Sequence, residues 1–156
     1  RKLDLSVSLA FEAAAMVRGQ ALDIAAETAE TPLDIDGITA LQSQKTGALI
    51  EWSATAGALM AGADPTPLGR YARALGLAFQ IADDILDVEG DVAKTGKAVG
   101  KDASAGKATF VSLLGLDEAK ARARALVAEA EDAIALYGKP AENLRAAARF
   151  VISREF

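Results

Sequence analysis

Three aspartates at helical spacing could bind a divalent cation. They are Asp83, Asp84 and Asp87 in the segment FQIADDILDVEGD, and Gln80 precedes them by one turn. In a helix these four side chains project from one side, while most of the other residues are apolar. Clustered carboxylates repel one another, so folding alone does not favour them, whereas hard divalent cations bind such oxygens. The alternative is a solvated acidic face, since charged stripes on helices are usually exposed.

A segment rich in glycine and lysine follows directly, GDVAKTGKAVGKDASAGK (90–107). Its glycines allow varied backbone conformations, and lysines such as Lys97 and Lys107 carry the point charges that suit phosphate. A solvated loop is the alternative. The segment is not a P-loop, because the glycine spacing is too long by one residue and a helix rather than a strand precedes it.

Two further polar groups lie upstream. Lys45 and Thr46 interrupt an apolar helical pattern, and Gln20 and Asp23 are three residues apart near the end of the first helix. Taken alone, each pair is also compatible with an ordinary exposed surface.

The composition excludes several classes of protein. The chain has 156 residues, no cysteine and no histidine, which removes disulfides, thiolate zinc sites and Ser/His/Asp triads. Its net charge of −5 offers no basic field to nucleic acid. No stretch is long enough to span a bilayer, so we expect no stable membrane insertion and a cytoplasmic protein.

The elements that must position these residues are helices. Hydrophobic residues make up 51% of the chain but aromatic ones only 5%, and the apolar residues repeat at helical spacing. Helices are predicted at about 3–28, 36–60, 68–89, 109–114, 116–137 and 142–153. Gly19 and Gly47 each lie inside a predicted helix. Gly19 favours a close approach, and Gly47 favours a kink or a ligand near the backbone. We therefore expect an all-α bundle of about six helices in a single domain, 1–156.

An acidic helix followed by a glycine-lysine segment forms a matched pair of elements. Carboxylates bind Mg²⁺, Mg²⁺ and lysines bind phosphate oxygens, and apolar helices enclose a dry cavity. This pattern predicts a site for a diphosphate with a hydrophobic tail.

These residues resemble the trans-prenyl diphosphate synthases, the farnesyl and geranylgeranyl diphosphate synthase family. FQIADDILDVEGD is similar to the second aspartate-rich motif of that family. GQALD, KTGALIEWSA, TGKAVGKDASAGKATF and the final RFVISREF are similar to its other landmarks, in the same order. The resemblance covers essentially the whole chain and implies a helical bundle of the isoprenoid synthase type.

The resemblance implies a role for each matching residue. Asp83, Asp84 and Asp87 would bind Mg²⁺ that bridges to an allylic diphosphate, which Lys45 would also bind. Thr46 would lie by the reacting carbons.

Three further groups of residues receive roles in the same way. Gln80 would line the pocket, Lys97 and Lys107 would close over the diphosphate, and Gln20 and Asp23 would lie beside the metal site. The implied reaction is prenyl transfer: an allylic diphosphate ionises, isopentenyl diphosphate attacks the cation, a proton leaves, and the chain grows by five carbons.

One departure from the family pattern affects these expectations. The family has a first aspartate-rich motif in its N-terminal half, and no such motif precedes Gln20 here. We therefore expect the C-terminal half of one prenyl synthase domain, with the N-terminal half absent, and no catalysis by this chain alone.

The resemblance implies a farnesyl diphosphate synthase that forms a homodimer and acts in isoprenoid biosynthesis. A geranylgeranyl diphosphate synthase and a non-catalytic subunit of a heteromeric synthase are the alternatives. A generic Mg²⁺- and anion-binding module and a terpene cyclase fit the motif order less well.

Overall fold

The computed structural model describes residues 2–89 and 108–153; the predicted phosphate-binding segment 90–107 and the chain end 154–156 lie outside them. All regular structure in the described ranges is helical, which confirms the predicted all-α bundle. None of the described helices is long and apolar enough to cross a membrane. The elements are α1 (Lys2–Ala26), α2 (Ile35–Gln42), η1 (Ser43–Gly47), α3 (Ala48–Ala61), α4 (Thr66–Glu89), α7 (Phe110–Leu114), α8 (Leu116–Ala133), η2 (Ala135–Tyr137), η3 (Lys139–Ala141) and α9 (Glu142–Ser153).

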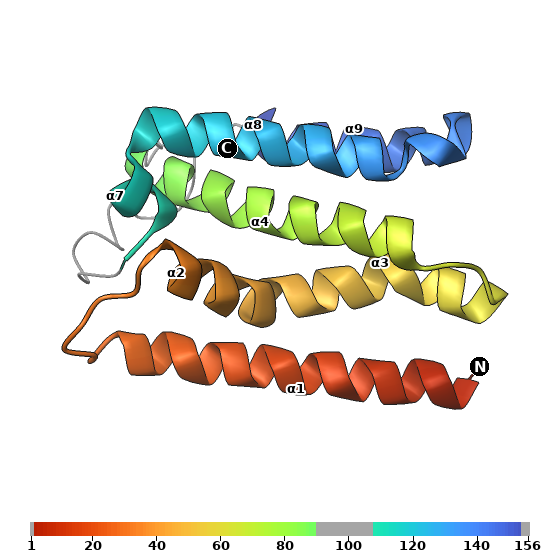
Figure 1. Ribbon diagram of the computed structural model, residues 1–156, viewed down its shortest axis with the longest axis horizontal. Coiled ribbons are helices and arrows are strands. Elements are labelled where there is room, and N and C mark those ends of the chain that lie inside the picture. The colour runs from red at the N-terminus through yellow and green to blue at the C-terminus, as the bar shows by residue number, and fades with distance from the viewer. Residues whose placement is uncertain (1, 90–107, 154–156) are drawn as a thin grey trace.

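The long helices run alternately up and down the bundle. Figure 1 shows α1 along one edge, then the rod formed by α2 and α3, then α4, with α8 and α9 on the opposite side. Because successive helices reverse direction, the end of α1, the start of α2 and the end of α4 meet at the same end of the bundle. The end of α1 carries Asp23, the end of α4 carries the aspartates, and Lys45 follows α2 in η1.

Local signals fix the helix boundaries. The Asp34 side chain accepts a hydrogen bond of 2.8 Å from the backbone N–H of Gly37 and so begins α2. Thr109 and Ser112 form a reciprocal capping box at the start of α7. Gly62 ends α3 in the left-handed conformation, with φ of 71°.

The predicted helix 36–60 is interrupted inside its span. Residues Ser43–Gly47 form a π-helical turn that joins α2 to α3 without a break in the rod. A π turn contains one residue more than an α-helical turn, and such turns are frequent at functional sites. The kink that Gly47 predicted is therefore a change of helix type, and Lys45 and Thr46 lie within it.

The core lies around α4, which packs between the rod and α8. Small residues with no exposed surface, among them Ala72, Ala78 and Ala130, let the helices approach closely. Ile81, Phe110 and Ile134 are the largest fully buried side chains of the described residues. This packing fixes the helix that carries the aspartates.

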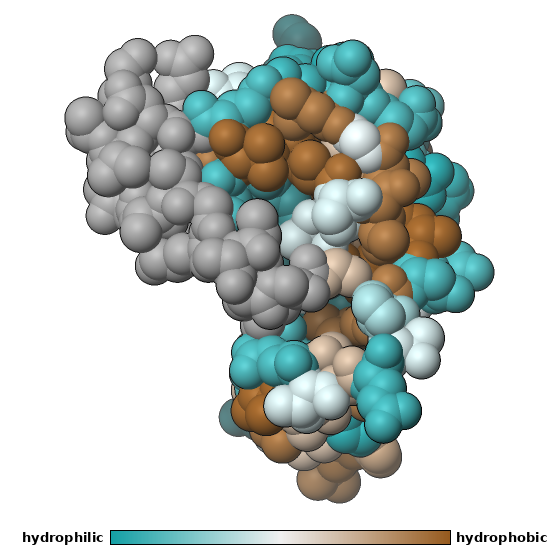
Figure 2. All heavy atoms as spheres, turned by 90° about the vertical axis from the view of Figure 1, so that its left-hand side faces the viewer, coloured by the Kyte–Doolittle hydropathy of each residue, from teal (hydrophilic) through white to brown (hydrophobic). Residues whose placement is uncertain are grey.

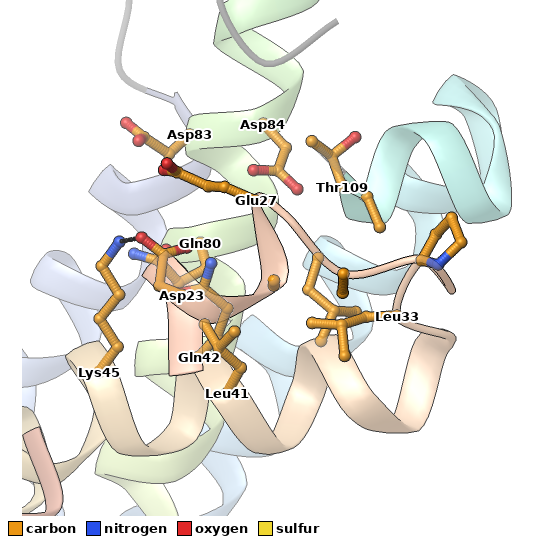
Figure 3. A pocket seen from close by; sticks show the side chains of 15 residues that line it. Asp23, Glu27, Leu33, Leu41, Gln42, Lys45, Gln80, Asp83, Asp84 and Thr109 are labelled. Atoms are coloured by element: carbon orange, nitrogen blue, oxygen red, sulfur yellow. Dashed lines mark hydrogen bonds and ion pairs between the residues drawn. The ribbon is translucent and has the colours of Figure 1, made fainter. Parts of the chain in front are cut away.

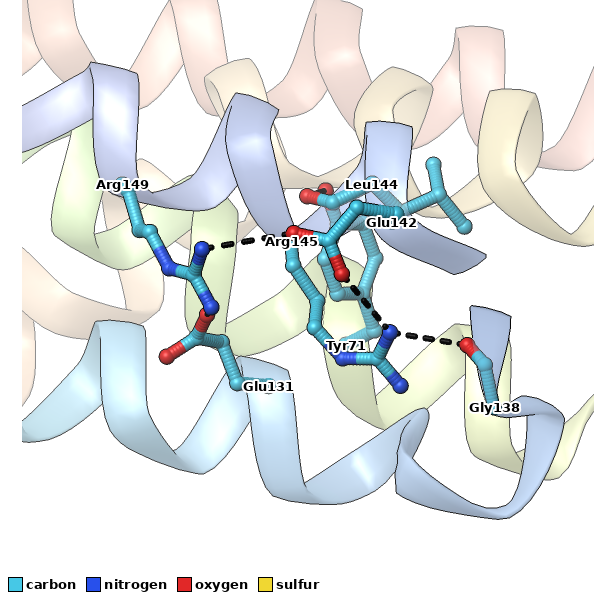
Figure 4. A network of polar contacts seen from close by, with 7 residues as sticks. All are labelled: Tyr71, Glu131, Gly138, Glu142, Leu144, Arg145 and Arg149. Atoms are coloured by element: carbon cyan, nitrogen blue, oxygen red, sulfur yellow. Dashed lines mark hydrogen bonds and ion pairs between the residues drawn. The ribbon is translucent and has the colours of Figure 1, made fainter. Parts of the chain in front are cut away.

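Polar contacts attach α9 to the core (Figure 4). The Tyr71 hydroxyl of α4 donates a hydrogen bond of 2.8 Å to the carbonyl oxygen of Leu144. Arg145 donates to the Gly138 carbonyl at 2.8 Å, and Arg149 forms an ion pair of 2.6 Å with Glu131 of α8. These contacts hold the last helix against both α4 and α8.

By contrast, α1 contacts its neighbours along one side only. Gly19 is its one buried residue. Apolar side chains on the outer side are exposed, including Leu3 at 74% and Phe11 at 70%. The described structure thus holds α1 through its contact with η1 and α3.

Candidate diphosphate site

A cavity of about 250 Å³ lies where α1, α2, η1 and α4 meet. Figure 2 shows this end of the molecule, where hydrophilic and hydrophobic surfaces adjoin. The residues that line the cavity are Asp23, Ala26, Glu27, Ala29, Pro32, Leu33, Ile38, Leu41, Gln42, Lys45, Gln80, Asp83, Asp84, Ala108 and Thr109.

Asp23 and Lys45 form an ion pair within this cavity. The Lys45 Nζ donates to Asp23 Oδ2 at 2.7 Å, and the two side chains are 31% and 15% exposed, respectively. The pair forms because α1 and η1 are in backbone contact one turn earlier, at Gly19, where a Cβ atom would lie only 2.6 Å from the Lys45 Cα. The close approach predicted at Gly19 is thus present, and it aligns Asp23 with the lysine.

The α4 helix contributes Gln80, Asp83 and Asp84 from the opposite wall (Figure 3). The α4 helix packs closely against the rod because the two cross where Gly76 faces Gly47. A Cβ atom on Gly76 would lie 3.5 Å from the Gly47 Cα. The acids therefore lie about two turns beyond a close helix crossing. They also lie near the carboxyl end of α4, which repels anions and so favours a cationic partner.

Asp84 has a second, structural contact. Its Oδ2 accepts a hydrogen bond of 2.7 Å from the backbone N–H of Phe110. Phe110 is 2% exposed, so this bond connects the acidic helix to a residue anchored in the core. Asp83 is exposed beside it.

The lining is strongly acidic in the described part of the chain. Asp23, Glu27, Asp83 and Asp84 supply four carboxylates, and Lys45 supplies one ammonium group. Figure 3 shows the Glu27 side chain beside Asp83 and Asp84. No three acidic side chains of the described residues converge closely enough to form a complete metal centre. The carboxylates of Asp83 and Asp84 are oxygen ligands of the kind that could hold a divalent cation.

A second, mainly apolar cavity of about 450 Å³ adjoins the first at Lys45. Its lining residues are Met16, Val17, Gln20, Ala21, Ile24, Lys45 and Thr46. Lys45 therefore borders a polar cavity on one side and an apolar one on the other. This arrangement can accommodate a molecule with a charged head and a hydrocarbon tail.

The predicted site residues thus fall into four groups. Those in the polar cavity are Lys45, Asp23, Gln80, Asp83 and Asp84, whereas Gln20 and Thr46 line the apolar cavity. Asp87 lines neither cavity. Lys97 and Lys107 lie outside the described residues.

The sequence interpretation missed three polar lining residues, Glu27, Gln42 and Thr109. Thr109 lies within TGKAVGKDASAGKATF, and the spacing gave a signal for the other two. Glu27 follows Asp23 by one helical turn, and Gln42 precedes Lys45 by three residues, so each shares a helix face with a residue that was predicted.

A model of the polyprenyl synthetase family matches residues 1–141. The chain is 40% identical over 151 residues to a dimethylallyltranstransferase of Fischerella ambigua, covering 95% of this chain and 43% of that protein. It is 42% identical over 149 residues to the farnesyl diphosphate synthase of Escherichia coli, covering 90% and 49%. The chain thus spans about half the length of these relatives.

Solved structures show the same fold. The apo FPP/GFPP synthase of Zymomonas mobilis superposes with a TM-score of 0.84 at 44% identity, covering 96% of this chain and 50% of that one. A geranyltransferase of Helicobacter pylori, complexed with magnesium and isoprenyl diphosphate, has a TM-score of 0.70 at 32% identity, covering 88% and 46%.

Proposed function

The chain belongs to the polyprenyl synthetase family, and from this premise we propose that the full-length protein is a prenyl diphosphate synthase. It condenses an allylic diphosphate with isopentenyl diphosphate, and farnesyl diphosphate is the product. The observation that carries the proposal is the Lys45–Asp23 pair at 2.7 Å in a cavity that Gln80, Asp83 and Asp84 also line. A cationic side chain facing carboxylates across a cavity matches a ligand made of a diphosphate and a metal ion.

Mg²⁺ is the proposed cofactor, held by Asp83 and Asp84 with Asp87 one turn further along α4. The donor set supports this assignment, since it consists of carboxylates and leaves open positions for phosphate oxygens. The H. pylori geranyltransferase was solved with magnesium and isoprenyl diphosphate. When bound, Mg²⁺ supplies positive charge that stabilises the departing diphosphate.

The residues of this chain bind and orient the reactants. Lys45 donates hydrogen bonds to the diphosphate of the allylic substrate, and Asp23 orients the lysine through the ion pair between them. Gln80 lies on the wall between these groups and the aspartates, where it can donate to a phosphate oxygen. Lys97 and Lys107 complete the proposed phosphate contacts.

The apolar cavity is the proposed site for the hydrocarbon tail. Met16, Val17 and Ile24 supply an apolar wall next to Lys45. Thr46 lines this cavity, where it lies next to the proposed position of the reacting carbon atoms. Gln20, which lines the same cavity, contacts the substrate near its charged end. The allylic cation forms when the C–O bond of the allylic diphosphate breaks and the electron pair leaves with the diphosphate. The double bond of isopentenyl diphosphate attacks the cation, and the resulting cation loses a proton to the released diphosphate.

The test is an assay of the full-length protein with isopentenyl diphosphate and dimethylallyl or geranyl diphosphate, with and without Mg²⁺. We expect Mg²⁺-dependent formation of a C15 product, identified by mass spectrometry. Asp83→Ala should reduce the rate at least a hundredfold, whereas Asp132→Ala, an exposed aspartate of α8 outside the cavity, should not. Absence of any prenyl transfer would contradict the proposal.

Geranylgeranyl diphosphate is the second candidate product, because a geranylgeranyl diphosphate synthase of Cyanophora paradoxa is 38% identical over 142 residues. A C20 product in the same assay would favour it. We also propose that the full-length protein is a cytoplasmic homodimer, which sedimentation and cell fractionation would test.

A further inference from the structure

Gln42 lies at the junction between α2 and the π-helical turn. It is the last residue of α2, three residues before Lys45. It lines the polar cavity together with Ile38, Leu41 and Lys45 of the same rod. Figure 3 shows Gln42 next to Asp23 and Gln80. Its side chain is therefore in the part of the cavity that Lys45 enters.

The side-chain amide oxygen of Gln42, Oε1, is buried without a hydrogen-bond partner among the described residues. A buried acceptor without a donor costs about 1–3 kcal/mol, and nearly all such groups in native proteins are paired. Ile38 lies one turn earlier on the same helix face and is buried and apolar, so this part of the rod accommodates a hydrocarbon side chain. Packing alone therefore does not explain an amide at position 42.

We propose that Gln42 is a further substrate-binding residue, whose amide turns into the cavity when a metal–diphosphate ligand enters it. There the amide N–H donates to a phosphate oxygen, and the carbonyl oxygen accepts from a water molecule of the hydrated metal. Both halves of the amide are then paired. The proposal rests on the proposed function, because it requires that the cavity bind a diphosphate.

The test compares Gln42→Met with Gln44→Met in the full-length protein. Methionine has a similar length and flexibility but cannot form the proposed hydrogen bonds. Gln44 is two residues further along the chain and does not line the cavity, so it is the matched control. The probe is inorganic pyrophosphate in the presence of Mg²⁺, followed by titration calorimetry, with urea unfolding of each variant in the absence of ligand.

Gln42→Met should weaken pyrophosphate binding about tenfold, as expected for the loss of a hydrogen bond to a charged group. Its urea midpoint should be unchanged or higher, because the unpaired carbonyl is gone. Gln44→Met should leave the affinity unchanged. A residue with only a structural role would change the urea midpoint and not the affinity.

The outcomes separate the two proposals. If the wild type binds Mg²⁺-pyrophosphate and Gln42→Met binds equally well, the role of Gln42 is overturned and the proposed function stands. If the wild type does not bind it, both are overturned. If Gln42→Met does not fold, the side-chain amide NMR signal of Gln42 in the wild type decides: it should shift on addition of Mg²⁺-pyrophosphate, and an unchanged signal overturns the proposal.

Discussion

The backbone of Gly19 in α1 lies directly against the backbone of Lys45 in the π-helical turn. A Cβ atom on Gly19 would come within 2.6 Å of the Lys45 Cα and 2.8 Å of the Gln44 carbonyl carbon. Backbone atoms cannot move aside as the end of a flexible side chain can. This contact therefore sets the separation of the two elements that supply Asp23 and Lys45 to the polar cavity.

Gly19→Ala should consequently destabilise the protein, although alanine favours helices. We expect a loss of about 1–3 kcal/mol in the free energy of unfolding, the usual range for overpacking, together with weaker Mg²⁺-pyrophosphate binding. Gly57→Ala is the matched control, since a Cβ at Gly57 would meet nothing within 4 Å. It should stabilise the protein by up to about 1 kcal/mol. Urea unfolding of both variants tests this, and equal effects would contradict it.

Two neighbouring aspartates of α4 should differ in their effect on stability. Asp84→Ala leaves the Phe110 N–H without its acceptor, so we expect a loss of about 1–3 kcal/mol in the free energy of unfolding. Asp83 is exposed, so Asp83→Ala should change the stability by no more than about 1 kcal/mol, since it removes exposed polar contacts together with a like-charged neighbour. Both should weaken Mg²⁺-pyrophosphate binding. Urea unfolding and calorimetry measure the two effects separately, and a large loss of stability in Asp83→Ala would indicate a structural aspartate.

Two lysines form ion pairs of the same length, but their substitution should affect ligand binding differently. Lys45 pairs with Asp23 at 2.7 Å inside the polar cavity, and Lys120 pairs with Glu89 at 2.7 Å outside it. Lys45→Met should weaken pyrophosphate binding at least tenfold, because it removes charge-assisted hydrogen bonds to the ligand. Lys120→Met should leave the affinity nearly unchanged. Each substitution should change the stability by no more than about 1 kcal/mol, because the pairs are partly exposed.

The stabilising contribution of Tyr71 should be lost at alkaline pH, so the free energy of unfolding should decrease there. Burial raises the pKa of Tyr71 above its ordinary value of 10.0. The unfolded chain then loses the tyrosine proton at a lower pH than the folded chain does. The stabilising contribution is therefore complete below about pH 10 and decreases as the pH rises from there through the folded-state pKa.

Tyr71→Phe tests this effect. At pH 7 it should cost about 1 kcal/mol, because the Leu144 carbonyl loses its donor. The difference in unfolding free energy between wild type and variant should narrow between pH 9 and pH 11. A constant difference over this interval would show that Tyr71 does not titrate differently in the two states.

Periodicity was sufficient to predict the helices, since the apolar stripes follow the buried faces of α4 and α8. It did not predict the π-helical turn, because Ser43–Gly47 contains no large apolar residue whose spacing could reveal the extra residue. The position of Thr46, which lines the apolar cavity and not the polar one, depends on the helix type at Ser43–Gly47.

The composition of the cavity was predictable only in part. The acidic stripe indicated Asp83 and Asp84, and resemblance indicated Lys45, Asp23 and Gln80. Which of these share a cavity depends on the helix crossings at Gly19 and Gly76 and not on the order of the residues. Glu27 and Gln42 were missed because neither belongs to a motif.

The π-helical turn contains one residue more than an ordinary helical turn needs, so the α2–α3 rod can lose a residue there and remain a helix. Removing one residue from Ser43–Gly47 would leave a segment that can form an ordinary α-helix, so the backbone would tolerate the deletion. If Ser43 or Gln44 is the residue removed, Gln42 comes to lie two residues before Lys45, and residues two apart in a helix do not share a face. A shortened chain could therefore assemble as a bundle and yet turn Gln42 away from Lys45, which makes this turn the place where a change in chain length separates folding from ligand binding.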